Sequence, residues 1–149
     1  MGEGVICVMS MEIVHLDGWR FKAECRSHHV FSDQPIEEDG GDTAMTPVEL
    51  FIASIGFCIG VYTKLFCDRH KVPSEGLEIH LEWEMAESPS RVGKIKVEIK
   101  FAGEVDSKSA NSILRFARHC TIHNTLTNPP KIDVMLSPLT KKSPGEKVT

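Results

Sequence analysis

The sequence predicts an α+β protein in which antiparallel sheets wrap around one long, buried central helix. Three observations lead to this prediction. Residues 47–70 are apolar with helix signals at both ends, residues 77–85 and 94–101 alternate between apolar and polar side chains, and Asp17-Gly18 is a hairpin signal. Alternating strands have one buried and one solvated face, as in antiparallel sheets that pack against helices.

The central helix has a well-defined start. Thr46 is a good N-cap, Pro47 suits the first helical turn, and Glu49 completes a capping box with Thr46. Basic residues in the last turns favour the C-terminal end of the helix dipole. From residue 50 to residue 61 the helix is apolar nearly all round, so it must be buried on most sides.

Projection at 100° per residue separates two stripes on this helix. One stripe contains Phe51, Ile55, Cys58, Tyr62 and Leu65. The opposite stripe is small throughout and contains Ala53, Gly56, Gly60, Thr63 and Cys67. Glycine inside a helix costs about 1 kcal/mol relative to alanine, so the two glycines predict close approach of another backbone. The same helix of a second subunit is the favoured candidate, which predicts a homodimer.

Composition excludes several classes of protein. The 149 residues suit one domain, predicted over 1–136, with 137–149 as a flexible tail. The net charge of −4 argues against nucleic acid as a partner. The apolar run of the helix is shorter than the ~20 residues of a membrane span and is closely flanked by charges. Five cysteines without a CxxC pair, and acidic residues Glu3 and Glu12 near the start, indicate a reducing cytoplasm.

The remaining elements follow from alternation and turn signals. Strands are predicted at 5–16, 19–26, 29–32, 77–85, 94–101 and 132–136, and a second helix at about 108–119. Residues 33–45 are predicted to be a loop. The acidic outer face of 77–85 and the mostly basic outer face of 94–101 suit an antiparallel pair with a solvated face.

Two cysteines stand out by their context. Cys58 lies in the middle of the central helix, and Cys120 lies where the second helix breaks, between His119 and His123. Both are either small buried hydrophobes or a dithiol pair, in which one thiolate is oxidised to a sulfenic acid and condenses with the second thiol. The two histidines and Cys120 could also suggest zinc, but zinc prefers four ligands and no second cluster completes the set. No metal or cofactor is therefore predicted.

Four segments together resemble the OsmC/Ohr family, the osmotically inducible protein C and organic hydroperoxide resistance proteins. They are Gly40-Gly41-Asp42, Thr46-Pro47-Val48-Glu49-Leu50, Ala53-Ser54-Ile55-Gly56-Phe57-Cys58 and Cys120-Thr121-Ile122-His123-Asn124-Thr125-Leu126. The resemblance implies an intertwined homodimer with active sites at the subunit interface. It also implies reduction of organic hydroperoxides, with Cys58 as the peroxidatic cysteine, Cys120 as the resolving cysteine and Glu49 paired with an arginine near the thiolate.

The chain departs from the family pattern at two places. It has no Gly-Gly-Arg segment near the N-terminus, so Arg26 is the first candidate for the activating arginine and Arg20 the second. Many relatives read Cys-Pro-Val-His in the second motif, where this chain has Thr121 in place of the proline. These departures make the sequence more similar to the broader OsmC-like subgroup than to the hydroperoxide resistance proteins proper.

Two functions remain open from the sequence. The first is a thiol-dependent peroxidase that takes an organic hydroperoxide and a dithiol reductant, with an apolar pocket formed by Phe51, Ile55, Phe57 and Tyr62. The second is a non-catalytic homodimer that binds a small apolar ligand in the same cleft, with its cysteines retained as packing. Neither a nucleic acid nor a membrane is an expected partner.

Overall fold

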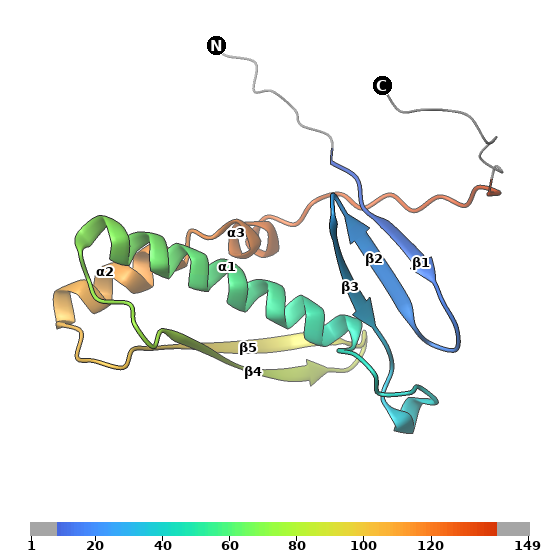
Figure 1. Cartoon of the computed structure of the whole chain (residues 1–149), viewed down its shortest axis with the longest axis horizontal. Coiled ribbons are helices and arrows are strands. Elements are labelled where there is room, and N and C mark those ends of the chain that lie inside the picture. Colours follow the sequence, from blue (N-terminus) through green and yellow to red (C-terminus); the bar gives the residue numbers. More distant parts are fainter. Residues whose placement is uncertain (1–8, 140–149) are drawn as a thin grey trace, which may run out of the picture.

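The fold is α+β, as predicted, with antiparallel sheets and a long central helix (Figure 1). The structure is a computed structural model that describes residues 9–139. Its elements, in chain order, are β1 (Glu12–His15), β2 (Phe21–Cys25), β3 (His28–Ser32), a 3₁₀ turn (Ile36–Glu38), α1 (Pro47–His70), β4 (Glu78–Ala86), β5 (Arg91–Lys100), α2 (Ser107–Ala117) and α3 (Thr121–Thr127).

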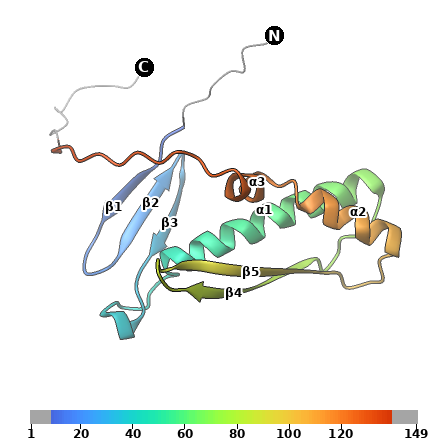
Figure 2. The ribbon, with the colours of Figure 1, turned by 180° about the vertical axis from the view of Figure 1, so that it is seen from behind.

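The other elements form two groups. The larger group packs on α1, and the smaller group is a sheet beside its N-terminal end. The hairpin β4–β5 covers one side of α1, and α2 and α3 pack on another side, as Figures 1 and 2 show from opposite directions. The sheet β1-β2-β3 stands beside the N-terminal end of α1 and does not cover the helix. The core is therefore built from α1, β4–β5 and the two short helices, which are also the elements that carry Cys58 and Cys120.

The ends of α1 follow the sequence signals. The Glu49 backbone N–H donates to the Thr46 side chain at 3.2 Å, and the Thr46 backbone N–H donates to the Glu49 carboxylate at 2.7 Å, which completes the capping box. Lys71 ends the helix in the left-handed conformation, with φ of 57°. By length and composition alone α1 could cross a membrane, and in this fold it packs against β4, β5, α2 and α3.

The small stripe of α1 faces β4 of the same chain, so its predicted role in a helix–helix contact is wrong. A Cβ added at Gly56 would lie 2.7 Å from Leu81 Cδ1, and one at Gly60 would lie 3.4 Å from Ile79 Cγ1. The two glycines let side chains of β4 approach the helix backbone closely. This close packing explains why glycine occurs twice inside the helix. Thr63, further along the stripe, is fully buried.

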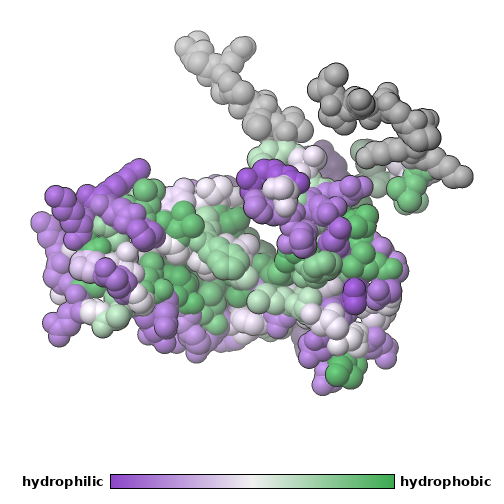
Figure 3. All heavy atoms as spheres, in the orientation of Figure 1, coloured by the Kyte–Doolittle hydropathy of each residue, from purple (hydrophilic) through white to green (hydrophobic). Residues whose placement is uncertain are grey.

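The outer side of α1 is exposed in the single chain. Phe57 and Val61 are 74% and 64% exposed. Figure 3 shows hydrophobic residues gathered over the middle of the molecule, along this helix. The sequence predicted burial on most sides, whereas one chain buries only the sides that face β4–β5, α2 and α3.

The β4–β5 hairpin confirms the predicted antiparallel pair. Glu82 lies opposite Lys96 and Glu84 opposite Lys94, and their ion pairs measure 3.1 and 2.9 Å. The hydrogen bond and charge of Lys96 lower the pKa of Glu82. A bulge at Glu84/Met85 shifts the register near the end of the pair. The charged face is solvated and the opposite face packs on α1.

The loop before α1 is organised by one buried carboxylate. Asp33 accepts hydrogen bonds from the Thr43 hydroxyl at 2.7 Å, the Thr43 backbone N–H at 3.1 Å and the Gln34 backbone N–H at 2.8 Å. These bonds, led by the Thr43 hydroxyl, hold its pKa at about 2. Gly40 lies so close to the Gln34 carbonyl that no side chain fits there. The sequence predicted the loop but not this carboxylate.

The N-terminal sheet and the C-terminal segment lack partners in one chain. Within the predicted strand 5–16, residues 12–15 form β1, residues 9–11 and 16 are not in a strand, and residues 5–8 lie outside the described range. The predicted strand 132–136 does not form within the single chain, because these residues pair with no strand in the part of the molecule that the structure describes. Ile132 and Val134 are 79% and 90% exposed. The predicted tail begins beside them, and its residues 140–149 also lie outside the described range.

Candidate thiol site

The fold brings Cys58 and Cys120 together. Cys58 lies midway along α1, and Cys120 is the N-cap of α3, in the connection that follows α2. Cys120 belongs to the buried core cluster of α1, and Cys58 packs against that cluster. After burial, the neighbouring Cys58 thiol also raises the pKa of the Cys120 thiol. The two cysteines that the sequence singled out are therefore neighbours across 62 positions of chain.

The two thiols have different surroundings. Cys120 is fully buried, whereas Cys58 is partly exposed. Burial is the largest cause of the raised pKa of Cys120, and the His123 backbone N–H, which donates to its Sγ at 3.3 Å, opposes this effect. Solvent and small molecules therefore reach Cys58 more readily than Cys120.

A polar contact lies beside the thiol pair. Tyr62 follows Cys58 by one helical turn, and its hydroxyl lies 3.4 Å from the hydroxyl of Thr121, the first residue of α3. The Tyr62 ring also packs against Phe116 of α2, with ring centroids 5.7 Å apart. Tyr62 therefore touches both short helices on either side of Cys120.

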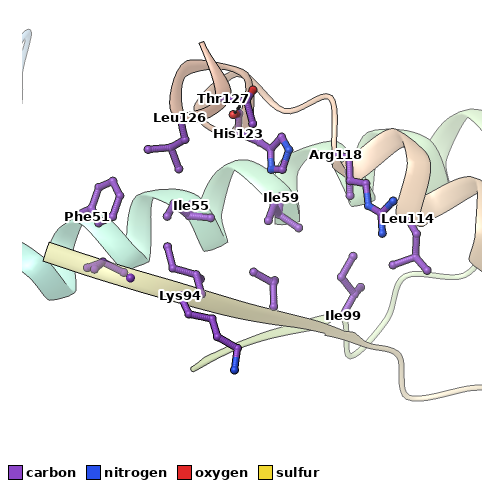
Figure 4. A pocket seen from close by; sticks show the side chains of 15 residues that line it. Phe51, Ile55, Ile59, Lys94, Ile99, Leu114, Arg118, His123, Leu126 and Thr127 are labelled. Atoms are coloured by element: carbon purple, nitrogen blue, oxygen red, sulfur yellow. Dashed lines mark hydrogen bonds between the residues drawn. The ribbon is translucent and has the colours of Figure 1, made fainter. Parts of the chain in front are cut away.

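An apolar cavity of about 570 Å³ lies between α1, β5 and the two short helices (Figure 4). Phe51 and Ile55 line it, as the sequence predicted for a substrate pocket. Tyr62 does not line it, and Phe57 points to the exposed outer side of α1. Aliphatic side chains of β5 form the opposite wall, namely Val92, Ile95, Val97 and Ile99.

Two basic residues at this cavity were missed by the sequence reasoning. Arg118 and His123 reach into the cavity from α2 and α3 (Figure 4). Both lie within three residues of Cys120, which is the signal that the sequence offers for them; the sequence indicates His123 only as a possible metal ligand and as part of the second motif, and it assigns no role to Arg118. Lys94 also lines the cavity, and its ammonium points away to pair with Glu84.

Glu49 and the two predicted arginines do not meet in one chain. Arg20 forms an ion pair with Asp17 at 3.6 Å in the β1–β2 hairpin, and Arg26 lies in the β2–β3 turn with φ of 56°. Over residues 9–139 no ion pair joins Glu49 to an arginine. The Glu49 carboxylate is instead engaged by the capping box.

The other cysteines lie away from this pair. Cys67 is fully buried near the end of α1, and burial raises its pKa. The Cys25 thiol lies 3.8 Å from the Ser10 carbonyl in the N-terminal sheet, and Cys7 falls outside the described residues. Across the described range, His, Cys, Asp and Glu side chains form no cluster of three that could hold a metal.

The chain is therefore an α+β protein with one long central helix, antiparallel sheets and two neighbouring thiols, one in α1 and one at the start of α3. Residues 40–135 match the sequence model of the OsmC-like protein family. The chain belongs to this family. A comparison with curated proteins gives no match.

Solved structures share the fold. A protein assigned to osmotic stress and detoxification response in Psychrobacter arcticus has a TM-score of 0.74 and 19% identity, over 81% of this chain and 90% of that one. An OsmC-like protein from Mycoplasma pneumoniae has a TM-score of 0.71 and 12% identity, over 83% and 89%. An organic hydroperoxide resistance protein from Legionella pneumophila has a TM-score of 0.60 and 17% identity, over 83% and 91%.

Proposed function

We propose that this protein is a thiol-dependent peroxidase that reduces organic hydroperoxides through Cys58 and Cys120. The observation that carries the proposal is that one core cluster holds a buried thiol, Cys120, and packs against a partly exposed thiol, Cys58, from a distant part of the chain. Membership in the OsmC-like family supports it, as does the fold shared with an organic hydroperoxide resistance protein.

The chemistry uses each thiol once. The Cys58 thiolate attacks the terminal peroxide oxygen of ROOH, the O–O bond breaks, and a proton is taken up, which gives ROH and a Cys58 sulfenic acid. The Cys120 thiol then attacks the Cys58 sulfur, a disulfide forms and water leaves. A dithiol reductant restores both thiols by exchange and becomes a disulfide itself. Cys58 is the first nucleophile because it is the thiol that a peroxide can reach.

The cavity suits the organic part of the substrate. Its walls are mostly aliphatic, and burial of each additional methylene group favours binding by about 0.8 kcal/mol. An alkyl or aryl hydroperoxide gains this free energy, whereas hydrogen peroxide does not. The cavity therefore favours an organic hydroperoxide with its carbon chain against Ile55 and the β5 side chains.

An arginine is expected to stabilise the Cys58 thiolate and polarise the peroxide. Arg26 and Arg20 lie in the N-terminal sheet, so either would act from the second subunit if the sheet of one chain packs on the other. Arg118 is a third candidate, because its side chain reaches the cavity within its own chain. Changing each arginine to methionine, and measuring the rate of Cys58 alkylation against pH, distinguishes these three.

We also propose that the working form is a cytoplasmic homodimer. A second copy would cover the exposed outer side of α1, and it would also cover the edges of β4 and β5 and the segment 132–136, which have no further strand partner within residues 9–139. Residues 132, 134 and 136 are apolar, and they would share one face if the segment paired as a strand with a second copy. The reducing cytoplasm suits a protein whose thiols must be regenerated.

Consumption of cumene hydroperoxide with dithiothreitol as reductant tests the proposal. The wild type is expected to turn over, and Cys58→Ser is expected to lose the activity. Cys25→Ser is the matched control, because this half-buried thiol lies in the N-terminal sheet, and it is expected to keep the activity. Absence of turnover by the wild type, or full activity of Cys58→Ser, would contradict the proposal.

A second candidate function is non-catalytic binding of a small apolar ligand. It is favoured by one observation, which is that neither sulfur of the thiol pair lines the cavity. This function predicts that an apolar fluorophore binds and is displaced without any change in thiol content. Equal binding by the wild type and Cys58→Ser, together with no peroxide consumption, would establish it.

A further inference from the structure

The start of α3 is attached to α1 by side chains from both elements. The Cys120 sulfur caps α3 by accepting the His123 backbone N–H, and Ile122 packs against the core cluster. The Tyr62 hydroxyl meets the Thr121 hydroxyl at 3.4 Å, immediately beside Cys120. This hydroxyl pair is the polar link between the α1 turn that follows Cys58 and the residue that follows Cys120.

At position 121 the hydroxyl of threonine, rather than its backbone conformation, provides the link to α1. Cys120 is extended, with φ of −63° and ψ of 147°, and Thr121 is the first helical residue of α3. Proline would suit both the backbone at this position and the residue before it. Local backbone geometry therefore does not require threonine, and its hydroxyl is the part that reaches α1.

We propose that Tyr62 and Thr121 are positioning residues that hold Cys120 beside Cys58 for disulfide formation. The proposal rests on the proposed redox role of the pair, and it concerns the second chemical step. The first step needs only a reactive Cys58 and a peroxide. The second step requires the Cys120 sulfur to stay within reach, so its rate depends on how α3 is held against α1.

The size of the effect follows from a single neutral hydrogen bond. Such a bond contributes a factor of about two to ten in an equilibrium constant, and its length and exposure here favour the lower part of that range. Loss of the bond is therefore expected to lower the effective concentration of Cys120 relative to Cys58 by about twofold to tenfold. The fall is expected to be the same whichever hydroxyl is removed.

The test is a glutathione redox equilibrium on the full chain, read as the fraction of Cys58–Cys120 disulfide by mass mapping. Tyr62→Phe and Thr121→Val are expected to lower the effective concentration, and their double variant to lower it no further. Thr121→Ser keeps the hydroxyl and is expected to retain the wild-type value. Thr125→Val is the matched control, because its hydroxyl donates to the Thr121 carbonyl within α3, at 2.8 Å.

A second readout separates positioning from general stability. After one equivalent of cumene hydroperoxide, Tyr62→Phe is expected to form the Cys58 sulfenic acid at the wild-type rate and to keep it longer, as dimedone capture reports. An unchanged effective concentration in both variants, or an equal fall in Thr125→Val, would overturn the positioning role. The glutathione result does not depend on peroxide, so a fall there without any reaction with hydroperoxide would reject the peroxidase and keep the positioning role.

Discussion

The two glycines of α1 should respond differently to alanine. Replacing glycine by alanine inside a helix stabilises it by about 1 kcal/mol, provided that the new methyl group has room. At Gly60 the added Cβ would lie 3.4 Å from Ile79 Cγ1, which is an ordinary contact. Gly60→Ala is therefore expected to raise the free energy of unfolding by about 0.5–1 kcal/mol.

At Gly56 the same change creates a clash. The added Cβ would lie 2.7 Å from Leu81 Cδ1, so the leucine must move within a packed core, at a cost of about 1–3 kcal/mol. Set against the gain of about 1 kcal/mol in helix propensity, Gly56→Ala is expected to be neutral or to lower the free energy of unfolding by up to about 2 kcal/mol.

Urea unfolding followed by circular dichroism, at one fixed protomer concentration, measures both effects. In a Leu81→Ala background, Gly56→Ala should recover most of its lost stability, with a coupling free energy of about 1–3 kcal/mol. Gly60→Ala should show little coupling to Leu81→Ala. Equal destabilisation by the two glycine changes, or no coupling between Gly56 and Leu81, would refute the packing of this stripe on β4.

Two further predictions concern acid stability and assembly. The pKa of Asp33 is about 2 in the folded protein against an ordinary 3.8, so its stabilising contribution is complete above about pH 4 and is lost as the pH falls towards 2. Urea midpoints measured down this range should therefore fall less steeply for Asp33→Asn than for the wild type. Val61→Glu places a charge on the exposed outer side of α1, so sedimentation should show a shift from dimer towards monomer. A wild-type protein that sediments as a stable monomer at micromolar concentration would contradict the proposed dimer.

The parts of the fold that depend on local signals could be predicted from the sequence. The capping box at Thr46 and Glu49 defined the start of α1, and the alternation of charged residues defined the β4–β5 pair. The helix α3 was not predicted, because seven residues are too short for a periodic pattern and its cap is a cysteine. The segment 132–136 has a strand pattern but no pairing partner in the chain, and pairing is not a local property.

The candidate site was predicted unevenly for related reasons. Their context marked Cys58 and Cys120 as a possible dithiol pair, but only the family resemblance implied their peroxidatic and resolving roles, because no spacing rule joins residues so far apart in sequence. The hydrophobicity of Phe57 suggested a pocket residue, but its direction on α1 points it outward. The glycines of the small stripe correctly predicted that another element approaches α1 closely. Only the fold shows that this element is β4, with two of its side chains, rather than a second helix.

The central claim is that Cys58 and Cys120 form one redox pair, and disulfide mapping tests it most directly. The protein is treated with one equivalent of tert-butyl hydroperoxide, the remaining thiols are alkylated, and the peptides are mapped by mass. The account predicts a Cys58–Cys120 link, with the other three of the five thiols alkylated. A link that involves Cys7, Cys25 or Cys67 in place of either one, or five alkylated thiols after full exposure to the peroxide, would contradict it.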